Sequence, residues 1–343
     1  MKVAQSIESP VSIFICISSP SRKAIASQLQ LDGKDVIAHV HNKLNESGLT
    51  CTVIDMSFAE QISLRLTREE VASSGSVLLT SHCPGWSLYA EKTQDDSVVN
   101  KLSKIRSPDQ IAGILVKSSI PGFSRRLSKN PWMSRFARPL NPIYFVCVSP
   151  CFDKKLEILR PTYKFGDSQQ IVDLVLTTTE LLNHLSTITS VTSSNRVVFD
   201  LSALLGLRVA VNAAEGGGYA DSVAGAEANW VTQRNRDLCF SEKAGRAFGF
   251  RNIQNILRRL KSAAGEVSRK EIIEVMACPG ACTLGGGQPP PNVHSDKSAS
   301  VHAYSDQSDW WLREIQGIHR ADAKSIFSAE WKSLAAGSSS FKW

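Results

Sequence analysis

Short runs of uninterrupted apolar residues recur along the chain and constrain its fold more than any other feature. They lie at residues 11–17, 51–54, 77–79, 143–148, 172–176 and 272–276. Continuous apolar character, without alternating polar residues, is typical of strands that are covered on both faces, as in parallel sheets. The runs therefore predict mostly parallel sheets that are flanked by helices.

Helical patterns lie between these runs. One amphipathic segment spans 36–44 and stops at Gly48, a residue typical of helix C-termini. Ser107 and Pro108 open a second helix as N-cap and first-turn residue, and Phe250–Leu260 predicts a third. Strands that alternate with helices indicate an α/β protein.

The length of 343 residues allows two closely packed lobes. We expect a first α/β lobe at 1–140, a second at 141–290, and a C-terminal segment at 291–343 that ends in a flexible tail. The apolar run at 11–17 is too short to cross a membrane, and no cleavage site for a leader follows it. These features predict a cytosolic chain whose cysteines are reduced, with no membrane partner.

Half of the eight cysteines lie just past an apolar run: Cys83, Cys151, Cys278 and Cys282. The carboxyl ends of parallel strands open into one crevice, so these thiols can meet there. Four sulfur ligands suit zinc or an iron–sulfur cluster. Zinc sites more often use paired C-x₂-C units, whereas the close pair here is C-x₃-C, which favours the cluster. We expect the other cysteines to be small buried apolar residues: Cys16, Cys51, Cys147 and Cys239.

The segments around the four cysteines resemble the signature motifs of iron-only hydrogenases, TSCCPxW, PCxxKxxE and ExMACxxGCxxGGGQP. They occur here, in the same order, as TSHCPGW, PCFDKKLE and EVMACPGACTLGGGQP. The resemblance implies that Cys83, Cys151, Cys278 and Cys282 ligate one [4Fe–4S] cluster between the two lobes of a hydrogenase-like fold.

Two departures from these motifs concern the site. His82 stands where hydrogenases have a second cysteine that relays protons to a di-iron unit, and Ala281 stands where a glycine is expected. His82 can be either a proton carrier or a hydrogen-bonded neighbour of the cluster. Lys154 either forms a helix-surface pair with Glu157 or offsets the negative charge of the cluster.

Further segments, among them CPGWSLYAEKT and GFRNIQNILRRLK, resemble the hydrogenase-related cytosolic iron–sulfur assembly factors of eukaryotes, the prelamin-A-recognition-factor-like branch. The match runs from about Ser18 to Gln288. Members of this branch usually carry an N-terminal cysteine cluster for a second [4Fe–4S]. This chain has no cysteine before Val11, so its sequence does not support that second cluster.

The resemblance implies a protein without hydrogenase activity that helps to pass [4Fe–4S] clusters to target apoproteins. Its expected partners are a cytosolic iron–sulfur scaffold and the proteins of a targeting complex. Two alternatives stay open, an iron-only hydrogenase and a metal-free interaction module. The hydrogenase would evolve hydrogen. The interaction module would bind partners with its cysteines reduced and without metal, and for it a nuclear location is also open.

The basic residues and the C-terminus give weaker indications. The net charge of +7 suggests acidic partners, and we do not expect nucleic acid to be one of them. The stretch from Lys117 to Pro139 has five further basic residues and no acidic one, which predicts a solvated loop or a docking site for an acidic protein. Trp343 ends a polar tail and can anchor a partner or be unordered.

Overall fold

The computed structural model describes residues 11–119, 143–165, 169–188, 199–200, 218–225, 228–232, 237–261, 266–290 and 327–328. Trp343 lies outside these residues, as does most of the basic loop predicted at 117–139. No helix within the described ranges has the length and apolar character needed to cross a lipid bilayer.

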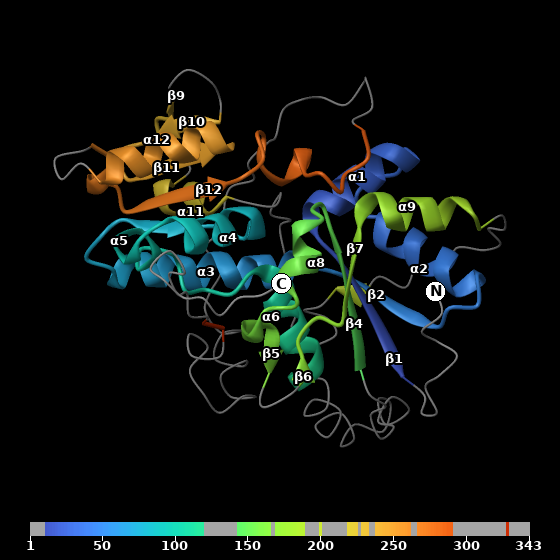
Figure 1. Cartoon of the computed structure of the whole chain (residues 1–343). Helices are drawn as coiled ribbons and strands as arrows, with labels where there is room; N and C mark the ends of the chain where they lie inside the picture. The colour runs from blue at the N-terminus through green and yellow to red at the C-terminus, as the bar shows by residue number, and fades with distance from the viewer. Residues whose placement is uncertain are drawn as a thin grey trace.

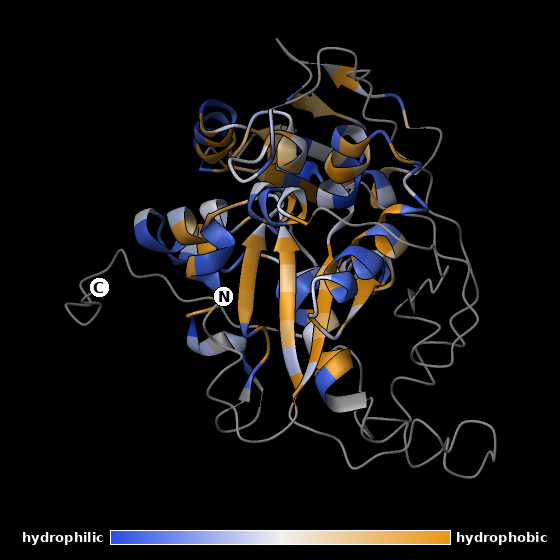
Figure 2. Ribbon diagram, turned by 90° about the vertical axis from the view of Figure 1, so that its right-hand side faces the viewer, coloured by the Kyte–Doolittle hydropathy of each residue, from blue (hydrophilic) through white to orange (hydrophobic). Residues whose placement is uncertain are grey.

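Sheet A stands on the right of Figure 1, and its five parallel strands follow the order β7-β4-β1-β2-β8. The strands are β1 (Ser12–Ile17), β2 (Cys51–Asp55), β4 (Ile143–Ser149), β7 (Leu174–Thr177) and β8 (Phe199–Asp200). The central strands are hydrophobic along most of their length, and the surrounding helices carry hydrophilic residues outward (Figure 2). This arrangement confirms the prediction of a parallel sheet between helices.

Side chains of β1 alternate between two hydrophobic cores. Ile15 and Ile17 pack with α1 (Ser19–Leu29), α2 (Val36–Glu46) and α9 (Thr178–Ser186). Phe14 and Cys16 face the opposite core, which is covered by α3 (Ser57–Ser73) and α6 (Pro108–Ile114). Each large apolar side chain buried in this way contributes about 1.5–3 kcal/mol.

Sheet B stands at the upper left of Figure 1 in the order β3-β12-β11-β10-β9. Its strands are β3 (Leu78–Thr80), β9 (Val231–Thr232), β10 (Leu238–Phe240), β11 (Ala244–Phe248) and β12 (Ile272–Met276). The first three strands of the order are parallel, and β10 is antiparallel to both of its neighbours. The apolar runs did not reveal β9 and β10, because these strands are only two and three residues long, or β11, because Gly245 and Arg246 interrupt its apolar residues.

Helix α3 is shared by the two sheets. Its Ile62 and Leu66 pack into the core of sheet A, whereas Leu64 and Val71 pack under sheet B beside α11 (Tyr219–Ala224). Helices α4 (Pro84–Thr93) and α12 (Phe250–Leu260) cover the other face of sheet B. Both sheets take strands from either side of residue 140, so the boundary predicted there does not separate them.

The remaining elements are short connections. They are α5 (Asp96–Val99), the π-helix η2 (Leu115–Ser119), α8 (Asp153–Glu157), η4 (Pro161–Tyr163), β5 (Lys164–Phe165), β6 (Gln169–Gln170), η5 (Glu266–Arg269) and η6 (Ala281–Leu284). Helix α8 lies between the two sheets in Figure 1.

The three predicted helices are present, but the start of the predicted basic loop needs correction. Helix α6 begins at Pro108 behind its N-cap Ser107, as expected, and then continues into η2. Within η2, Lys117 is buried, and its Nζ lies 2.5 Å from Asp173 Oδ2 and 2.5 Å from the carbonyl oxygen of Gln170. Lys117 is therefore a core residue, and these two partners provide the hydrogen bonds that a buried ammonium needs.

Candidate iron–sulfur site

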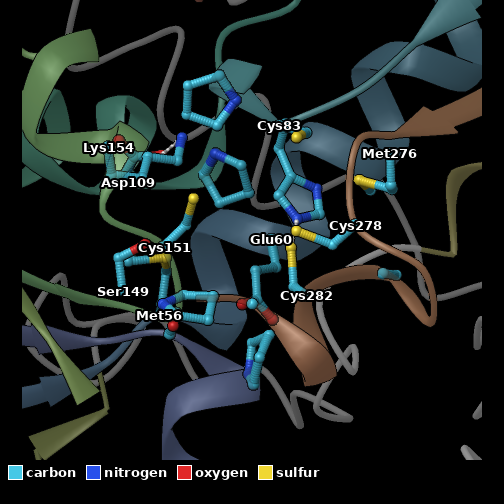
Figure 3. Close-up of a pocket in the computed structure, with 18 of the residues that line it drawn as sticks. Met56, Glu60, Cys83, Asp109, Ser149, Cys151, Lys154, Met276, Cys278 and Cys282 are labelled. Carbon is cyan, nitrogen blue, oxygen red and sulfur yellow. Dashed lines mark hydrogen bonds and ion pairs between the residues drawn. The ribbon is translucent and has the colours of Figure 1, made fainter. Parts of the chain in front are cut away.

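The four strand-end cysteines line one pocket between the two sheets (Figure 3). Cys151 follows β4 of sheet A, Cys83 follows β3 of sheet B, and Cys278 and Cys282 follow β12. The empty space of the pocket, including its mouth, is about 730 Å³. The fold therefore brings together the four cysteines that the strand-end rule selected, although they come from segments far apart in the sequence.

Local backbone structure positions each thiol. Cys83 is the N-cap of α4, Pro84 fixes the first turn, and the Cys83 N–H donates to Ser81 Oγ at 3.0 Å. Gly280 and Ala281 both have left-handed φ values, of 69° and 56°, and turn the chain from Cys278 into η6. The motif has glycine at position 281. Because alanine has a Cβ atom, the left-handed backbone conformation of Ala281 is strained.

The glycine-rich segment after Cys282 fastens one side of the pocket to the other. The Gly287 N–H donates to the carbonyl oxygen of Pro150 at 2.8 Å, next to Cys151. A Cβ atom at Gly285 would lie 2.4 Å from the same oxygen, which no real contact allows. These glycines let the loop carrying Cys278 and Cys282 approach the end of β4, as a site shared between two sheets requires.

Burial controls the protonation of the four thiols. Cys83 is buried and the other three are half-buried. Loss of solvation raises the pKa of all of them, that of Cys151 to about 12 and that of Cys282 well above the usual value. The thiolate form is the one that binds metal, so cations in the pocket would have to displace these protons.

Backbone N–H groups are directed at three of the sulfur atoms. The Ala277 N–H donates to Cys83 Sγ at 3.4 Å, and backbone N–H groups of Asp153 and Gly286 serve Cys151 and Cys278. Such donors stabilise metal-bound thiolates and cluster sulfides. The donor set, soft sulfur with amide hydrogens around it, fits an iron–sulfur cluster.

His82 lies against the fourth sulfur atom. Its Nε2 is 3.1 Å from Cys282 Sγ, and its ring packs on Tyr219 with 5.9 Å between the ring centroids. Burial, followed by the charge of Lys154, lowers the pKa of His82 to about 4, so the imidazole is neutral at physiological pH. The geometry makes it a hydrogen-bonding neighbour of a predicted cluster ligand.

Lys154 lines the pocket but is held by two carboxylates. Its Nζ lies 2.8 Å from Asp109 Oδ1 and 2.7 Å from Glu157 Oε2, and all three residues are buried. Burial alone would lower the pKa of Lys154, but the two carboxylates raise it overall. The pair with Glu157 predicted from the i,i+3 spacing thus exists, although it is in the interior and not on the helix surface.

Sequence reasoning did not identify Asp109 or Glu60. Asp109 accepts a hydrogen bond from the Tyr163 hydroxyl at 2.9 Å, yet in sequence it looks like an ordinary acidic residue in the first turn of a helix. Glu60 lines the pocket and accepts from the Ser19 N–H at 3.1 Å and the Ser19 hydroxyl at 2.5 Å. Burial raises the pKa of Glu60 to about 7.

Glu274, two residues before the motif methionine, supports the site from behind. Its carboxylate accepts from the backbone N–H groups of Gly218 at 3.1 Å and Ala220 at 3.0 Å. These contacts place Tyr219 between them, and Tyr219 in turn packs on His82. The motif itself was the signal that could have identified Glu274.

The other cysteines are buried in the hydrophobic cores, as predicted: Cys16, Cys51, Cys147 and Cys239. Cys147 additionally lines the pocket. Within the described ranges, no group of three or more His, Cys, Asp or Glu side chains is arranged to hold a single metal ion.

Residues 12–286 match the model of the family described as iron only hydrogenase large subunit, C-terminal domain. A protein of Danio rerio named cytosolic Fe-S cluster assembly factor narfl is 30% identical over 92% of this chain and 78% of its own length. A probable cytosolic Fe-S cluster assembly factor of Caenorhabditis elegans, oxy-4, is 34% identical over 69% of this chain.

This chain spans only part of several relatives. It covers 54% of the nematode protein and 62% of cytosolic iron-sulfur assembly component 3 of Rattus norvegicus, to which it is 32% identical over 80% of its own length.

A solved structure of a variant of [FeFe]-hydrogenase HydA1 from Chlamydomonas reinhardtii matches with a TM-score of 0.67 over 96% of both chains. The sequence identity is 16%, so this likeness concerns the fold. The two-lobed hydrogenase-like fold expected from the motifs is confirmed. The chain belongs to the family of the iron-only hydrogenase large subunit, C-terminal domain, in the branch that includes the Danio rerio protein narfl.

Proposed function

We propose that this protein holds one [4Fe–4S] cluster through Cys83, Cys151, Cys278 and Cys282 and works in cytosolic iron–sulfur protein assembly. It would accept a cluster from scaffold proteins and, with targeting-complex proteins, help to transfer clusters to apoproteins. The observation that carries the proposal is the meeting of four distant strand-end cysteines in one pocket. Relatives that are about 30% identical and named as cytosolic Fe-S assembly factors support it.

The arrangement of the thiols favours a cluster over a single ion, because among the described residues no three of them are placed to hold one metal ion. In a cubane cluster each thiolate binds a different iron, so the four sulfur atoms surround the core and do not converge on one point. A zinc site would need them at about 2.3 Å from one ion. The residues of this chain would supply the thiolates, the backbone donors and a partly open edge at the half-buried cysteines, where ligand exchange can take place.

We infer that the protein is not an enzyme. A hydrogenase would need a second iron unit and a proton relay, and the resemblance places that relay at the position of His82. Here the His82 ring nitrogen is directed at Cys282 Sγ, and Lys154 is bound by two carboxylates. A hydrogen-evolution assay with reduced viologen should therefore show no activity, whereas turnover would favour the hydrogenase alternative.

Cluster transfer tests the proposal directly. Reconstituted protein is mixed, without oxygen, with the apo form of a ferredoxin-type acceptor. The absorbance of the cluster bound to this protein should fall as the acceptor gains cluster. Cys151→Ser should prevent loading, and Cys51→Ala, which changes a thiol outside the pocket, should transfer normally. Normal loading and transfer by Cys151→Ser would overturn the assigned ligand set.

The C-terminal residue Trp343 remains a proposed partner anchor. Its removal should weaken capture of targeting-complex proteins and leave the iron content unchanged. The metal-free alternative predicts instead that partners bind equally well to protein whose four cysteines are all replaced by serine.

A further inference from the structure

Hydrogen bonds to the four predicted ligands are of two kinds. Cys83, Cys151 and Cys278 accept from backbone N–H groups, which no substitution of those donor residues other than proline would remove. Cys282 Sγ instead lies 3.1 Å from a side-chain nitrogen, Nε2 of His82. The donor to Cys282 is therefore set by the side chain at position 82.

We propose that His82 is a positioning residue that donates a permanent hydrogen bond from Nε2 to the Cys282 thiolate and thereby raises the reduction potential of the cluster. The inference rests on the proposed function only in requiring the cluster. It assigns His82 an electrostatic role in place of proton transfer.

The direction of the hydrogen bond follows from ligation. A neutral imidazole has one N–H and one bare nitrogen. A thiolate bound to iron has no proton, so Cys282 Sγ can only accept, and the N–H must be on Nε2. The opposite nitrogen, Nδ1, is buried and has no hydrogen-bond partner among the residues that the structure describes, so it is available to be the bare nitrogen.

A second contact holds the imidazole in this orientation. Its ring packs on Tyr219, whose hydroxyl is hydrogen-bonded to Ser63 Oγ at 2.9 Å. On the sulfur side, Gln288 Nε2 lies 3.3 Å from the Cys282 carbonyl oxygen and 3.1 Å from that of Pro20. Both partners of the hydrogen bond are thus fixed by separate contacts.

The effect on the cluster follows from charge. Reduction adds an electron to a core already bound by four thiolates, and a donor at sulfur stabilises the more negative state. Lys154 also acts on Cys282 electrostatically, but its charge is offset by Asp109 and Glu157. Removing the His82 donor should therefore make the cluster harder to reduce.

The test compares the wild type with His82→Leu and His82→Gln, each loaded anaerobically and titrated while the reduced cluster is followed by electron paramagnetic resonance. At a fixed ambient potential, Leu should lower the reduced-to-oxidised ratio about tenfold, which is 59 mV for one electron. Gln keeps an N–H donor and should recover most of that loss. His39→Leu, a change to a histidine of α2 that does not line the pocket, is the control and should leave the ratio within about twofold of the wild type.

A second measurement does not depend on the variants. Wild-type protein labelled with ¹⁵N-histidine should show a weak nitrogen coupling and an exchangeable proton at the reduced cluster. A normally loaded His82→Leu protein with an unchanged potential would overturn the inference, as would the strong coupling of a nitrogen bound directly to iron. Wild-type protein that holds no cluster would instead overturn the proposed function as well.

Discussion

Replacement of Lys154 by methionine should expose the cost of the buried charge cluster beside the pocket. Methionine nearly fills the space of the lysine stem, so the change removes the ammonium with little loss of packing. It leaves Asp109 and Glu157, which are 3% and 4% exposed, without their cation and without hydrogen bonds of 2.8 and 2.7 Å. Breaking a buried ion pair in this way costs about 3–5 kcal/mol.

The assay is urea denaturation followed by circular dichroism, with the same metal content in all samples. The matched control combines Lys154→Met with Asp109→Asn and Glu157→Gln, which removes the unpaired charges and keeps an acceptor for the Tyr163 hydroxyl. This triple variant should regain more than half of the lost stability. A single variant that loses less than about 1 kcal/mol, or a triple variant as unstable as the single one, would refute the account of this cluster.

The pH dependence of Lys154→Met provides a further check. Without the cation, burial raises the pKa values of Asp109 and Glu157 in the folded state above those in the unfolded state. A carboxyl group with a raised folded pKa stabilises the fold below its unfolded pKa, and this contribution is lost as the pH rises through the folded value. The defect should therefore be largest at neutral pH and smaller near pH 5.

Three smaller changes test other parts of the structure. Ala281→Gly should raise the unfolding free energy by about 1 kcal/mol, because residue 281 has a φ of 56°, and an unchanged melting temperature would contradict the strained backbone. Gly285→Ala should abolish cluster loading, because its Cβ would lie 2.4 Å from the Pro150 carbonyl oxygen. Gly286→Ala is the control and should load normally, because the atom nearest to its Cβ would be 3.8 Å away. Equal loading of the two variants would contradict the close approach. Glu60→Gln should remove part of the fall in stability between about pH 5 and 7, because the Glu60 pKa is raised to about 7 and its ionisation opposes folding in that range; parallel stability curves for the two proteins would refute this.

The sequence was informative where a single physical rule applied. Continuous apolar runs identified β1, β2 and β4, because a strand that is covered on both faces buries mainly apolar side chains. The strand-end rule then located Cys83, Cys151, Cys278 and Cys282, since the carboxyl ends of the parallel strands face one pocket.

Features that depend on packing between distant segments could not be predicted in this way. Helix α3 contacts both sheets, and nothing in its own pattern shows that it has two buried faces. Asp109 and Lys117 look like exposed charged residues in sequence, and only the folded chain supplies the partners that allow their burial. The hydrogen bond from His82 to Cys282 joins residues 200 positions apart, which is beyond the reach of local patterns.

The central claim is that Cys83, Cys151, Cys278 and Cys282 hold one [4Fe–4S] cluster. The most direct test is the content of iron, acid-labile sulfide and zinc per chain in protein purified without oxygen, for the wild type and Cys278→Ser. We expect about four iron and four sulfide in the wild type, as for one cubane, and a large loss in the variant. Zinc alone, no metal after reconstitution, or an unchanged cluster content in Cys278→Ser would contradict the claim.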